Sequence, residues 1–308
     1  MSNPDFSVIV PARNAAATIA ATIASVLAQT VRDFELLLID DGSTDRTLHI
    51  MLEAAALDER LHVISLDGVG AARARNIGVE HAHGALIAFL DADDLWVPEK
   101  LERHAALHAG PVAPDASYAA VTFLDPRRTY AHGSSRSTVG AGPLTPAQAV
   151  AENPVCTMSN LVVSREAWKR TGALRNGMQH AEDQEWLARA TLAGCHIVGI
   201  DEVLVRYRTT SGGLSSDLRR MHAGWRRFAR TYQDRVDIRA AEAVYCRYLA
   251  RRALRLGEPA RVARRYALLG LRYSPSAFLA DRWRGGMTLA GAFAGPFLPL
   301  VLRNRLFA

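Results

Sequence analysis

Short apolar runs alternate with alanine-rich or amphipathic segments over the first hundred residues of the chain. The apolar runs predict strands at residues 6–11, 34–40, 61–66 and 85–90. The segments between and after them predict helices at residues 15–29, 45–57, 71–83 and 98–109. Strands that alternate with helices form parallel β-α-β units with right-handed crossovers, so the pattern predicts an open, doubly wound, mostly parallel α/β sheet.

The alternation becomes less regular after about residue 115. Further strands are predicted at residues 117–124, 160–164, 196–200 and 203–208, and helices at residues 165–170 and 181–193. Glycine, serine and proline mark a loop or hairpin at residues 126–146 and a linker at residues 209–216. The remainder is predicted to be helical, with two helices at residues 240–256 and 259–273. We therefore expect one α/β domain at residues 1–213 and a helical extension at residues 214–308.

The two predicted domains differ in charge. The chain has a net charge of +6, but residues 215–308 contain 19 Arg and 6 Asp or Glu, about +13, which leaves about −7 for the rest. A basic helical extension is compatible with contact to anionic lipid, nucleic acid or acidic partners, and equally with a solvated arginine-rich face. Residues 286–302 are apolar but shorter than the roughly 20 residues that span a bilayer. They fit a segment lying on a membrane surface or a cover packed on the domain.

The chain contains three cysteines, which are far apart and have no metal-binding spacing. The first residues lack the basic and apolar regions of a signal peptide, and the first strand begins almost at once. Both features predict a reduced, cytoplasmic protein.

The strand at residues 85–90 runs into three carboxylates, Asp91, Asp93 and Asp94. Neighbouring carboxylates repel one another, and a bound cation is the simplest way to stabilise them. Carboxylate oxygens suit Mg²⁺ or Mn²⁺, whose coordination is usually completed by substrate phosphates. The alternative is that Asp93 or Asp94 only caps the following helix, which would require a single acid.

Three more polar clusters lie near strand ends or helix starts. Asp41, in Asp40-Asp-Gly-Ser-Thr-Asp45, can bind a ribose hydroxyl or a base N–H, while Ser43 or Thr44 caps the next helix. Arg73 and Arg75 can neutralise phosphates, although a surface salt bridge is an alternative for Arg73. Glu182 and Asp183 open a helix, where acids are favoured by the dipole, and either can also serve as a general base.

Taken together, these stretches resemble the family 2 glycosyltransferases, which have the GT-A fold. The resemblance covers about residues 6–210. Five motifs occur in the family's order: Val8-Ile-Val-Pro-Ala-Arg-Asn14, Asp40-Asp-Gly-Ser-Thr-Asp45, Ala74-Arg-Asn-Ile-Gly78, Asp91-Ala-Asp-Asp94 and Glu182-Asp183. Each motif is weak alone, but the five in this order are specific to the family and not to a substrate.

The resemblance implies a role for each site residue. The nucleoside of a sugar nucleotide would be held by Asp41 and by Pro11, Ala12, Arg13 and Asn14, with Arg75 near its phosphates. Asp91 and Asp93 would form the Asp-x-Asp element that binds nucleotide and Mg²⁺ or Mn²⁺, with Asp93 the direct ligand. Asp183 would be the base of an inverting single displacement, supported by Glu182. The metal would neutralise the diphosphate leaving group.

Two departures from the family refine this expectation. Many relatives carry a His after the Tyr-Arg that is Tyr207-Arg208 here, whereas this chain has Thr209-Thr210, so a third protein ligand to the metal is in doubt. The Gln-x-x-Arg-Trp element of processive synthases is absent. The resemblance therefore implies a non-processive enzyme that adds one sugar, commonly from a uridine diphosphate sugar, to a hydroxyl of a glycan or lipid-linked glycan in bacterial surface glycan assembly.

The expected partners follow from this reading. We expect no nucleic acid among them. Peripheral contact of the basic helices with the inner face of the membrane, and a homodimer, are both compatible with the sequence. Three alternatives remain at the level of sequence: a phosphohydrolase, a non-catalytic binding or scaffold protein that uses the helical extension, and a signalling receiver. The first usually has its Asp-x-Asp on the first strand, and the last leaves Asp91, Asp93 and Asp183 without a role.

Overall fold

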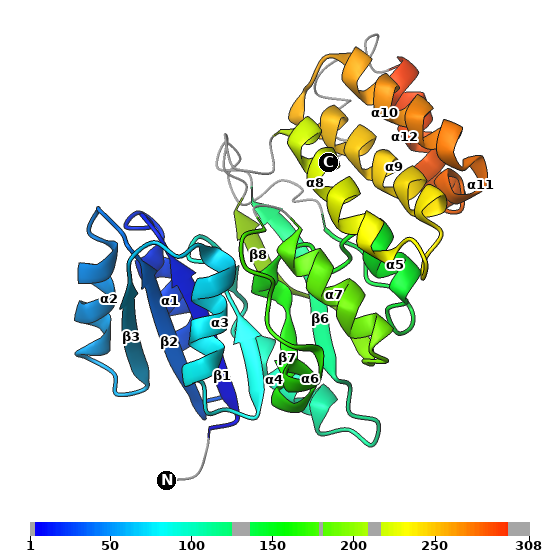
Figure 1. Cartoon of the computed structure of the whole chain (residues 1–308). Helices are drawn as coiled ribbons and strands as arrows, with labels where there is room; N and C mark the ends of the chain where they lie inside the picture. The colour runs from blue at the N-terminus through cyan, green and yellow to red at the C-terminus, as the bar shows by residue number, and fades with distance from the viewer. Residues whose placement is uncertain (1–3, 125–135, 179–180, 209–216, 295–308) are drawn as a thin grey trace. The chain divides into compact units, whose positions relative to one another are not determined.

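The computed structural model describes residues 4–124, 136–178, 181–208 and 217–294 of the 308-residue chain (Figure 1). It consists of two compact units. The sheet unit comprises Met1–Leu144, Pro154–Met178 and Glu185–Thr210, and the helical unit comprises Thr145–Asn153, Gln179–Gln184 and Ser211–Ala308. The predicted domain boundary at residue 213 and the predicted linker lie outside the described residues.

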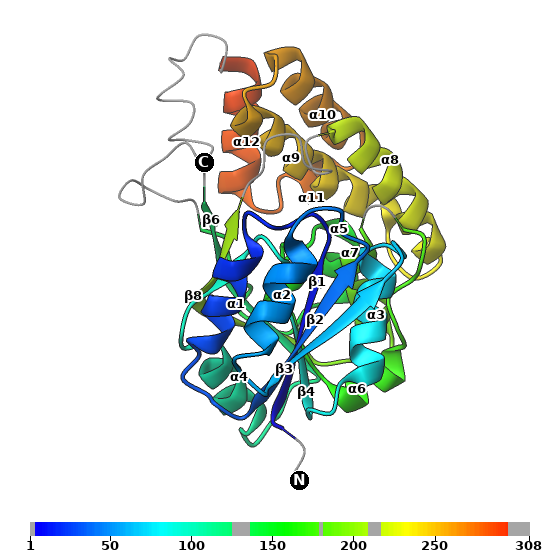
Figure 2. The same ribbon diagram turned by 90° about the vertical axis from the view of Figure 1, so that its left-hand side faces the viewer.

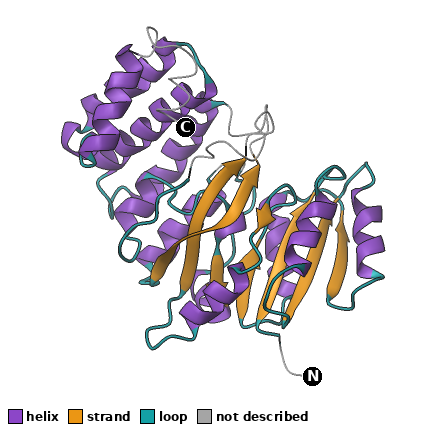
Figure 3. Cartoon of the chain, turned by 180° about the vertical axis from the view of Figure 1, so that it is seen from behind, coloured by secondary structure: helices purple, strands orange, loops and turns teal. Residues whose placement is uncertain are grey.

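The sheet unit is built on an eight-stranded sheet with the order β3-β2-β1-β4-β7-β6-β8-β5 (Figure 3). The strands are β1 (Phe6–Ala12), β2 (Phe34–Asp41), β3 (Leu61–Leu66), β4 (Leu86–Phe89), β5 (Leu95–Trp96), β6 (Ala116–Leu124), β7 (Val162–Ser164) and β8 (Ile197–Arg208). β1 to β4 are parallel, as are β6 and β8, whereas β7 and β5 run antiparallel to their neighbours. The predicted α/β class with a mostly parallel sheet is confirmed.

Helices cover both faces of this sheet. They are α1 (Ile19–Leu27), α2 (Thr47–Ala55), α3 (Ala71–His81), α4 (Lys100–His108), α6 (Arg165–Thr171) and α7 (Glu182–Leu192), whose first three residues belong to the helical unit. α1 and α4 lie on one face, and α3 and α6 lie on the other (Figure 2). Every residue of β1 and β2 is buried, as expected for strands covered on both faces.

Close packing of α3 on the sheet depends on Gly78. A Cβ at this position would lie 2.5 Å from Cγ2 of Ile9 on β1, well inside van der Waals contact. Glycine therefore lets the helix approach the strand, and Arg75, one turn earlier in the same helix, is held at the sheet edge.

Several predicted elements differ from those observed. α1 begins at Ile19 instead of residue 15, because the amides of Ala15 and Ala16 donate to the side chains of Thr47, the first residue of α2, and of Asp45 just before it. The two strands predicted at residues 196–208 form one strand, β8, which pairs with β6 across two register shifts. Asp93 and Asp94 precede strand β5, and the N-cap of α4 is Glu99. The alternative in which one of these acids only caps the following helix is therefore wrong.

The helical unit contains α5 (Pro146–Ala151), α8 (Leu218–Ala229), α9 (Ile238–Leu256), α10 (Ala260–Tyr273), α11 (Pro275–Phe278) and α12 (Arg282–Ala294). α9 and α10 match two predicted helices and are separated by Gly257, whose φ of 74° ends α9 in the left-handed conformation. Of the apolar segment at residues 286–302, the part up to Ala294 belongs to α12 and the rest lies outside the described residues. None of the described helices is long and apolar enough to cross a membrane.

Candidate functional site

The strand order reverses between β1 and β4. The chain proceeds from β1 to β2 to β3 in one direction, and β4 then pairs with the opposite edge of β1. Ligands of open α/β sheets bind beyond the carboxyl ends of the strands at such a reversal. β1 is followed there by Arg13 and Asn14, β2 ends at Asp41, and β4 leads into Asp91. The fold therefore brings the predicted nucleotide-binding motifs to one edge of the sheet unit.

Asn14 links the loops that follow β1 and β2. Its φ of 51° is unusual for a residue other than glycine. Its backbone N–H donates to Oγ of Ser43 at 3.0 Å, and its Oδ1 accepts from the backbone N–H of Thr44 at 2.8 Å. Ser43 and Thr44, expected to cap α2, instead bond to this loop, and neither residue is the N-cap of α2. Asn14 thus fixes the loops that would face a nucleoside.

The other residues of the first motif differ in exposure. Pro11 and Ala12 are buried at the end of β1, whereas Arg13 is exposed. The Arg13 guanidinium lies beside the backbone of Gly68, 3.4 Å from the position that a Cβ would occupy there. Only Arg13 and Asn14 therefore present side chains to solvent at this point of the edge.

Asp41 holds the loop before α3. It is buried, and its two carboxylate oxygens accept from the backbone N–H groups of Val69 at 2.6 Å and Gly70 at 2.9 Å. Its neighbour Asp40 is also buried and accepts from the Ser43 amide at 3.2 Å, but its Oδ1 has no hydrogen-bond partner among the described residues. Sequence reasoning assigned Asp41 to a ligand, and in this structure it also organises protein backbone.

Arg75 and Asp91 form an ion pair. Arg75 is buried, and its Nη2 donates to Oδ1 of Asp91. Oδ2 of Asp91 accepts from the Thr157 hydroxyl at 3.1 Å, and the Asp91 backbone N–H donates to Oγ of Ser159 at 2.9 Å. Asp91 is therefore stabilised by protein groups, and the Arg75 charge is directed to it.

Asp94 is stabilised in a different way. Its Oδ2 accepts from the Ser159 hydroxyl at 2.6 Å, and its Oδ1 accepts from the backbone N–H of Arg208 at 2.9 Å. Burial, followed by the charges of Asp91 and Asp93, raises the pKa of this carboxyl well above its usual value. Asp94 thus ties the loop after β4 to the end of β8.

Asp93 is the third acid of the group. It is partly exposed, its carboxylate accepts from its own backbone amide, and the charges of Arg208 and Arg75 act on it weakly. Burial, and then the charge of Asp91, raises its pKa. A nearby cation would reverse this shift, so Asp93 is the acid best suited to be a metal ligand.

A buried network of hydrogen-bonded side chains supports the segment that holds these acids. Lys100 is fully buried, and its Nζ lies 3.0 Å from Nε2 of His104 and 3.3 Å from the carbonyl oxygen of Asn160. The Ser117 hydroxyl lies 2.7 Å from Nδ1 of His104 and 2.9 Å from Nε2 of His108. Burial lowers the pKa of Lys100 to about 7 and that of His108 to about 4. Sequence reasoning missed this network of side chains, because its members appear as separate polar residues of a helix and two other segments.

Asp183 and Glu182 belong to the helical unit, where they open α7. Oδ2 of Asp183 accepts from Nδ2 of Asn153 at 2.5 Å, and its Oδ1 accepts from the backbone N–H of Gln184 at 2.7 Å. Asp183 is therefore an ordered carboxylate with a defined amide partner.

The donor set for a metal ion is small. Among the residues that the structure describes, no group of three or more His, Cys, Asp or Glu side chains is arranged to hold one. The Thr209-Thr210 position at which relatives supply a His lies outside the described ranges. Asp93, with Asp91 beside it, fits Mg²⁺ or Mn²⁺ whose remaining ligands come from substrate phosphates and water.

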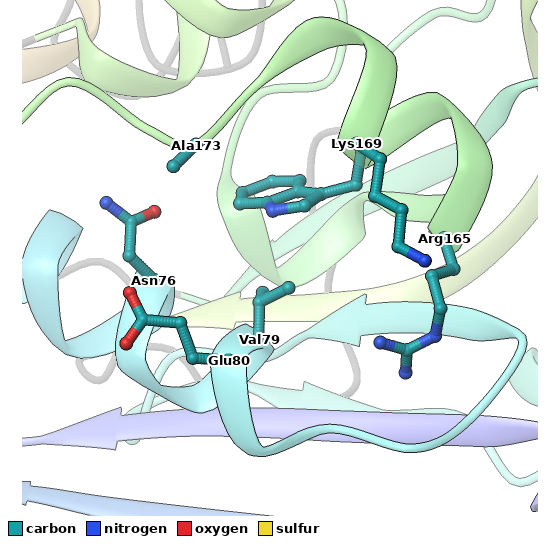
Figure 4. A pocket seen from close by; sticks show the side chains of 7 residues that line it. Asn76, Val79, Glu80, Arg165, Lys169 and Ala173 are labelled. Atoms are coloured by element: carbon teal, nitrogen blue, oxygen red, sulfur yellow. The ribbon is translucent and has the colours of Figure 1, made fainter.

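A pocket of about 290 Å³ opens elsewhere on the sheet unit, between α3 and α6 (Figure 4). The residues that line it are Asn76, Val79, Glu80, Arg165, Trp168, Lys169 and Ala173. Arg165 donates to the carbonyl oxygen of Gly84, just before β4 begins, so this wall lies toward the amino end of β4. None of the lining residues was predicted as a site residue, and none of Asp41, Asp91, Asp93 and Asp183 lines this pocket.

The family model for glycosyl transferase family 2 matches residues 7–172, more than half of the chain. This stretch contains β1 to β4, the loops at their carboxyl ends and the acidic group after β4. The chain belongs to glycosyltransferase family 2.

A relative in Escherichia coli and two solved structures illustrate the similarity. The chain is 46% identical over 97 residues to the UDP-Glc:alpha-D-GlcNAc-diphosphoundecaprenol beta-1,3-glucosyltransferase WfgD, a match that covers 31% of this chain and 38% of that protein. The match spans only 16% to 42% of the length of four curated relatives, this one included.

Among solved structures, residues 1–349 of TarS from S. aureus in complex with UDP-GlcNAc superpose with a TM-score of 0.58 at 19% identity, covering 94% of this chain and 92% of that one. The mannosyltransferase PcManGT from Pyrobaculum calidifontis, with GDP-Man and Mn²⁺, gives a TM-score of 0.54 at 20% identity and covers 98% and 79%. At these identities the likeness shows the GT-A-type fold alone.

Proposed function

We propose that this chain transfers one sugar from a nucleoside diphosphate sugar, preferably a UDP sugar, to a hydroxyl of a glycan or lipid-linked glycan. The reaction would depend on Mg²⁺ or Mn²⁺ and would invert the anomeric centre. Family membership supports the reaction class. The name of WfgD supports a UDP sugar and a lipid diphosphate acceptor, and the PcManGT complex supports a divalent metal.

The observation that carries the proposal is that the three acids after β4 differ in their bonding partners. Asp91 is paired with Arg75 and Asp94 is buried against Ser159, so Asp93 is the one whose carboxylate remains for a ligand among the described groups at this edge. A bound Mg²⁺ or Mn²⁺ would neutralise charge on the diphosphate leaving group. Asp93 would hold this ion, and the Arg75–Asp91 pair would fix the loop from which Asp93 projects.

The nucleoside would lie against the loops after β1 and β2. Asn14 and Ser43 hold these loops in one conformation, and Asp41 does the same for the loop before α3. Each oxygen of Asp41 has a lone pair beyond the one that accepts from the backbone, so Asp41 can also accept from a base N–H. This arrangement would orient the donor without a change in backbone.

Asp183 would act as the general base, with Glu182 supporting it or the acceptor. An ionised carboxylate can take the proton from the acceptor hydroxyl as the oxygen attacks the anomeric carbon. The bond between that carbon and the β-phosphate oxygen of the donor breaks, and the nucleoside diphosphate leaves. A single displacement of this kind inverts the configuration. No covalent sugar intermediate on the protein is needed.

We also propose that the acceptor is membrane-bound and that the protein acts in the cytoplasm at the inner membrane face. The helical unit presents many arginines, and Trp283 on α12 is 77% exposed. Arginine and exposed tryptophan together suit an anionic membrane surface.

A thermal-shift screen of UDP, GDP, CDP and dTDP, each with and without Mn²⁺, tests the donor and metal assignments. We expect one nucleotide, UDP, to raise the Tm only when Mn²⁺ is present. Asp93→Asn should abolish the Mn²⁺-dependent part of the shift, because the neutral amide is a much weaker ligand for a divalent ion.

Asp58→Asn is the matched control. Asp58 pairs with Arg60 in the loop before β3, away from the carboxyl ends of the strands, so this variant should keep the full shift. An Asp93→Asn protein that still shows the Mn²⁺-dependent shift of the wild type would refute the metal assignment.

A further inference from the structure

Asp183 receives a short hydrogen bond from a neutral side chain in the helical unit. Nδ2 of Asn153 lies 2.5 Å from Oδ2 of Asp183. An ionised carboxylate only accepts hydrogen bonds, so the NH₂ group of the Asn153 amide must face it. A bond of this kind stabilises the ionised form of the acid over the protonated form.

The backbone that carries Asn153 is fixed by the segment that carries Asp183. Nε2 of Gln184 donates to the carbonyl oxygens of Ala149 at 3.0 Å and Val150 at 2.9 Å, and Nε1 of Trp225 donates to the same Val150 carbonyl at 2.8 Å. These carbonyls lie in the last turn of α5, where helices lack internal partners. Gln184, the residue after Asp183, thus holds the last turn of α5. Asn153 follows the end of this helix by two residues.

The start of α5 is fixed as well. Thr145 and Gln148 form a capping box, in which the Thr145 hydroxyl accepts from the Gln148 backbone N–H and the Gln148 side chain accepts from the Thr145 backbone N–H. α5 has only six residues and would not be stable alone. The start of α5 is therefore held by contacts between Thr145 and Gln148 that involve neither Asn153 nor Asp183.

We propose that Asn153 is a positioning residue for Asp183: its amide orients the carboxylate and keeps it ionised, so that Asp183 can accept the proton of the acceptor hydroxyl. This inference rests on the proposed role of Asp183 as general base. It adds a residue that none of the sequence motifs contains, since Asn153 lies thirty positions before Asp183.

Two titratable neighbours of Asp183 are established among the described residues. Glu182 precedes it on α7, and Tyr245 on α9 lies close enough to interact with it electrostatically. Burial first, and the charge of Asp183 among smaller effects, raises the pKa of Tyr245 well above its usual value. Tyr245 is therefore a neutral neighbour throughout the range in which Asp183 titrates.

The test is an NMR titration of the full chain labelled with ¹³Cγ-aspartate. The Asp183 resonance is assigned by its loss in Asp183→Asn, and its midpoint is followed in the wild type and in two variants. Asn153→Ala removes the donor and should move the midpoint to higher pH by about one unit. Asn153→Asp places a second carboxylate there and should move it further, because like charges disfavour ionisation.

Gln148→Ala is the matched control. It weakens the capping box of α5 without touching Asp183, so it should lower the Tm and leave the midpoint unchanged. Equal midpoints in wild type and both Asn153 variants would overturn the inference, and so would a shift in Gln148→Ala as large as that in Asn153→Ala. Asn153→Asp nearly preserves side-chain shape and keeps the test available if Asn153→Ala does not fold.

Nucleotide release from UDP-GlcNAc or UDP-glucose with Mn²⁺ separates this inference from the proposed function. If Asp183→Asn stops release but the Asn153 variants leave the titration unchanged, the base assignment stands and the positioning role of Asn153 is wrong. If the titration responds as expected but Asp183→Asn releases nucleotide at the wild-type rate, the proposed base is wrong while the Asn153–Asp183 coupling stands.

Discussion

Asp91 and Asp94 are carboxylates at the sheet edge that are bonded to other parts of the protein. Asp94 is buried with Ser159 and the Arg208 amide, and Asp91 is bonded to Arg75 and Thr157. Their partners come from segments 16 to 114 residues away in the chain. The sequence therefore predicted correctly that the acids need compensation, but local pattern could not reveal that two of the three receive it from the protein.

Lys100 provides a residue-scale prediction. Its pKa is lowered by burial to about 7, whereas an unfolded lysine has a pKa of about 10.4. Between these values the unfolded chain binds more protons than the folded one. The contribution of Lys100 to the free energy of unfolding should therefore rise as the pH increases from about 7 toward 10, by at most about 1.4 kcal/mol per pH unit. Below pH 7 this contribution should not change with pH.

Urea unfolding at several pH values between 7 and 9, for the wild type and Lys100→Met, measures this effect. The difference in the free energy of unfolding between the two proteins should change with pH, because the methionine cannot titrate. His108, with a pKa of about 4, is neutral throughout this range and does not contribute. Parallel curves for the two proteins would show that Lys100 is not buried as described.

At the scale of elements, the contact between α3 and β1 determines where Arg75 lies. Gly78 has no side chain, and Ile9 fills the space that one would occupy. Alanine is favoured over glycine in a helix by about 1 kcal/mol, so glycine here reflects packing and not helix propensity. The same reasoning explains why the predicted helix at residues 71–83 was correct although it contains a glycine.

Gly78→Ala should destabilise the sheet unit by about 1–3 kcal/mol, because a new Cβ at 2.5 Å from Ile9 must displace either the helix or the strand. Gly286→Ala in α12 is the matched control, since nothing lies within 4 Å of its new Cβ, and it should be neutral or stabilising. A double-mutant cycle with Ile9→Ala, measured by urea unfolding, should show that the smaller residue relieves part of the cost. A Gly78→Ala protein as stable as the wild type would contradict this account.

The elements that sequence analysis missed share a physical cause. β5 has two residues and α5 has six, so neither is long enough to show a period. Both exist because distant groups bond to them: β5 pairs with β8, and α5 is held by Gln184 and Trp225. In contrast, β1 to β4 and α3 were predicted within a few residues, because burial on both faces dictates their composition.

At the scale of the whole chain, the charge is unevenly distributed. The 19 arginines of residues 215–308 lie in the part of the chain that forms most of the helical unit. We predict that the protein cosediments with vesicles that contain phosphatidylglycerol and not with pure phosphatidylcholine vesicles, and that high salt reduces binding by screening. Trp283→Ala should weaken binding several-fold without lowering the Tm, since Trp283 is largely exposed. Equal binding to both vesicle types would contradict the prediction.

Each unit also contains its own aromatic stack. In the sheet unit the indoles of Trp168 and Trp186 stack at a centroid distance of 5.5 Å, and in the helical unit Trp225 stacks on Tyr245 at 4.9 Å. Stacked chromophores couple their ultraviolet transitions, and a pair of indoles couples differently from an indole and a phenol. Circular dichroism can therefore distinguish the melting of one unit from that of the other in the intact chain, without an added label.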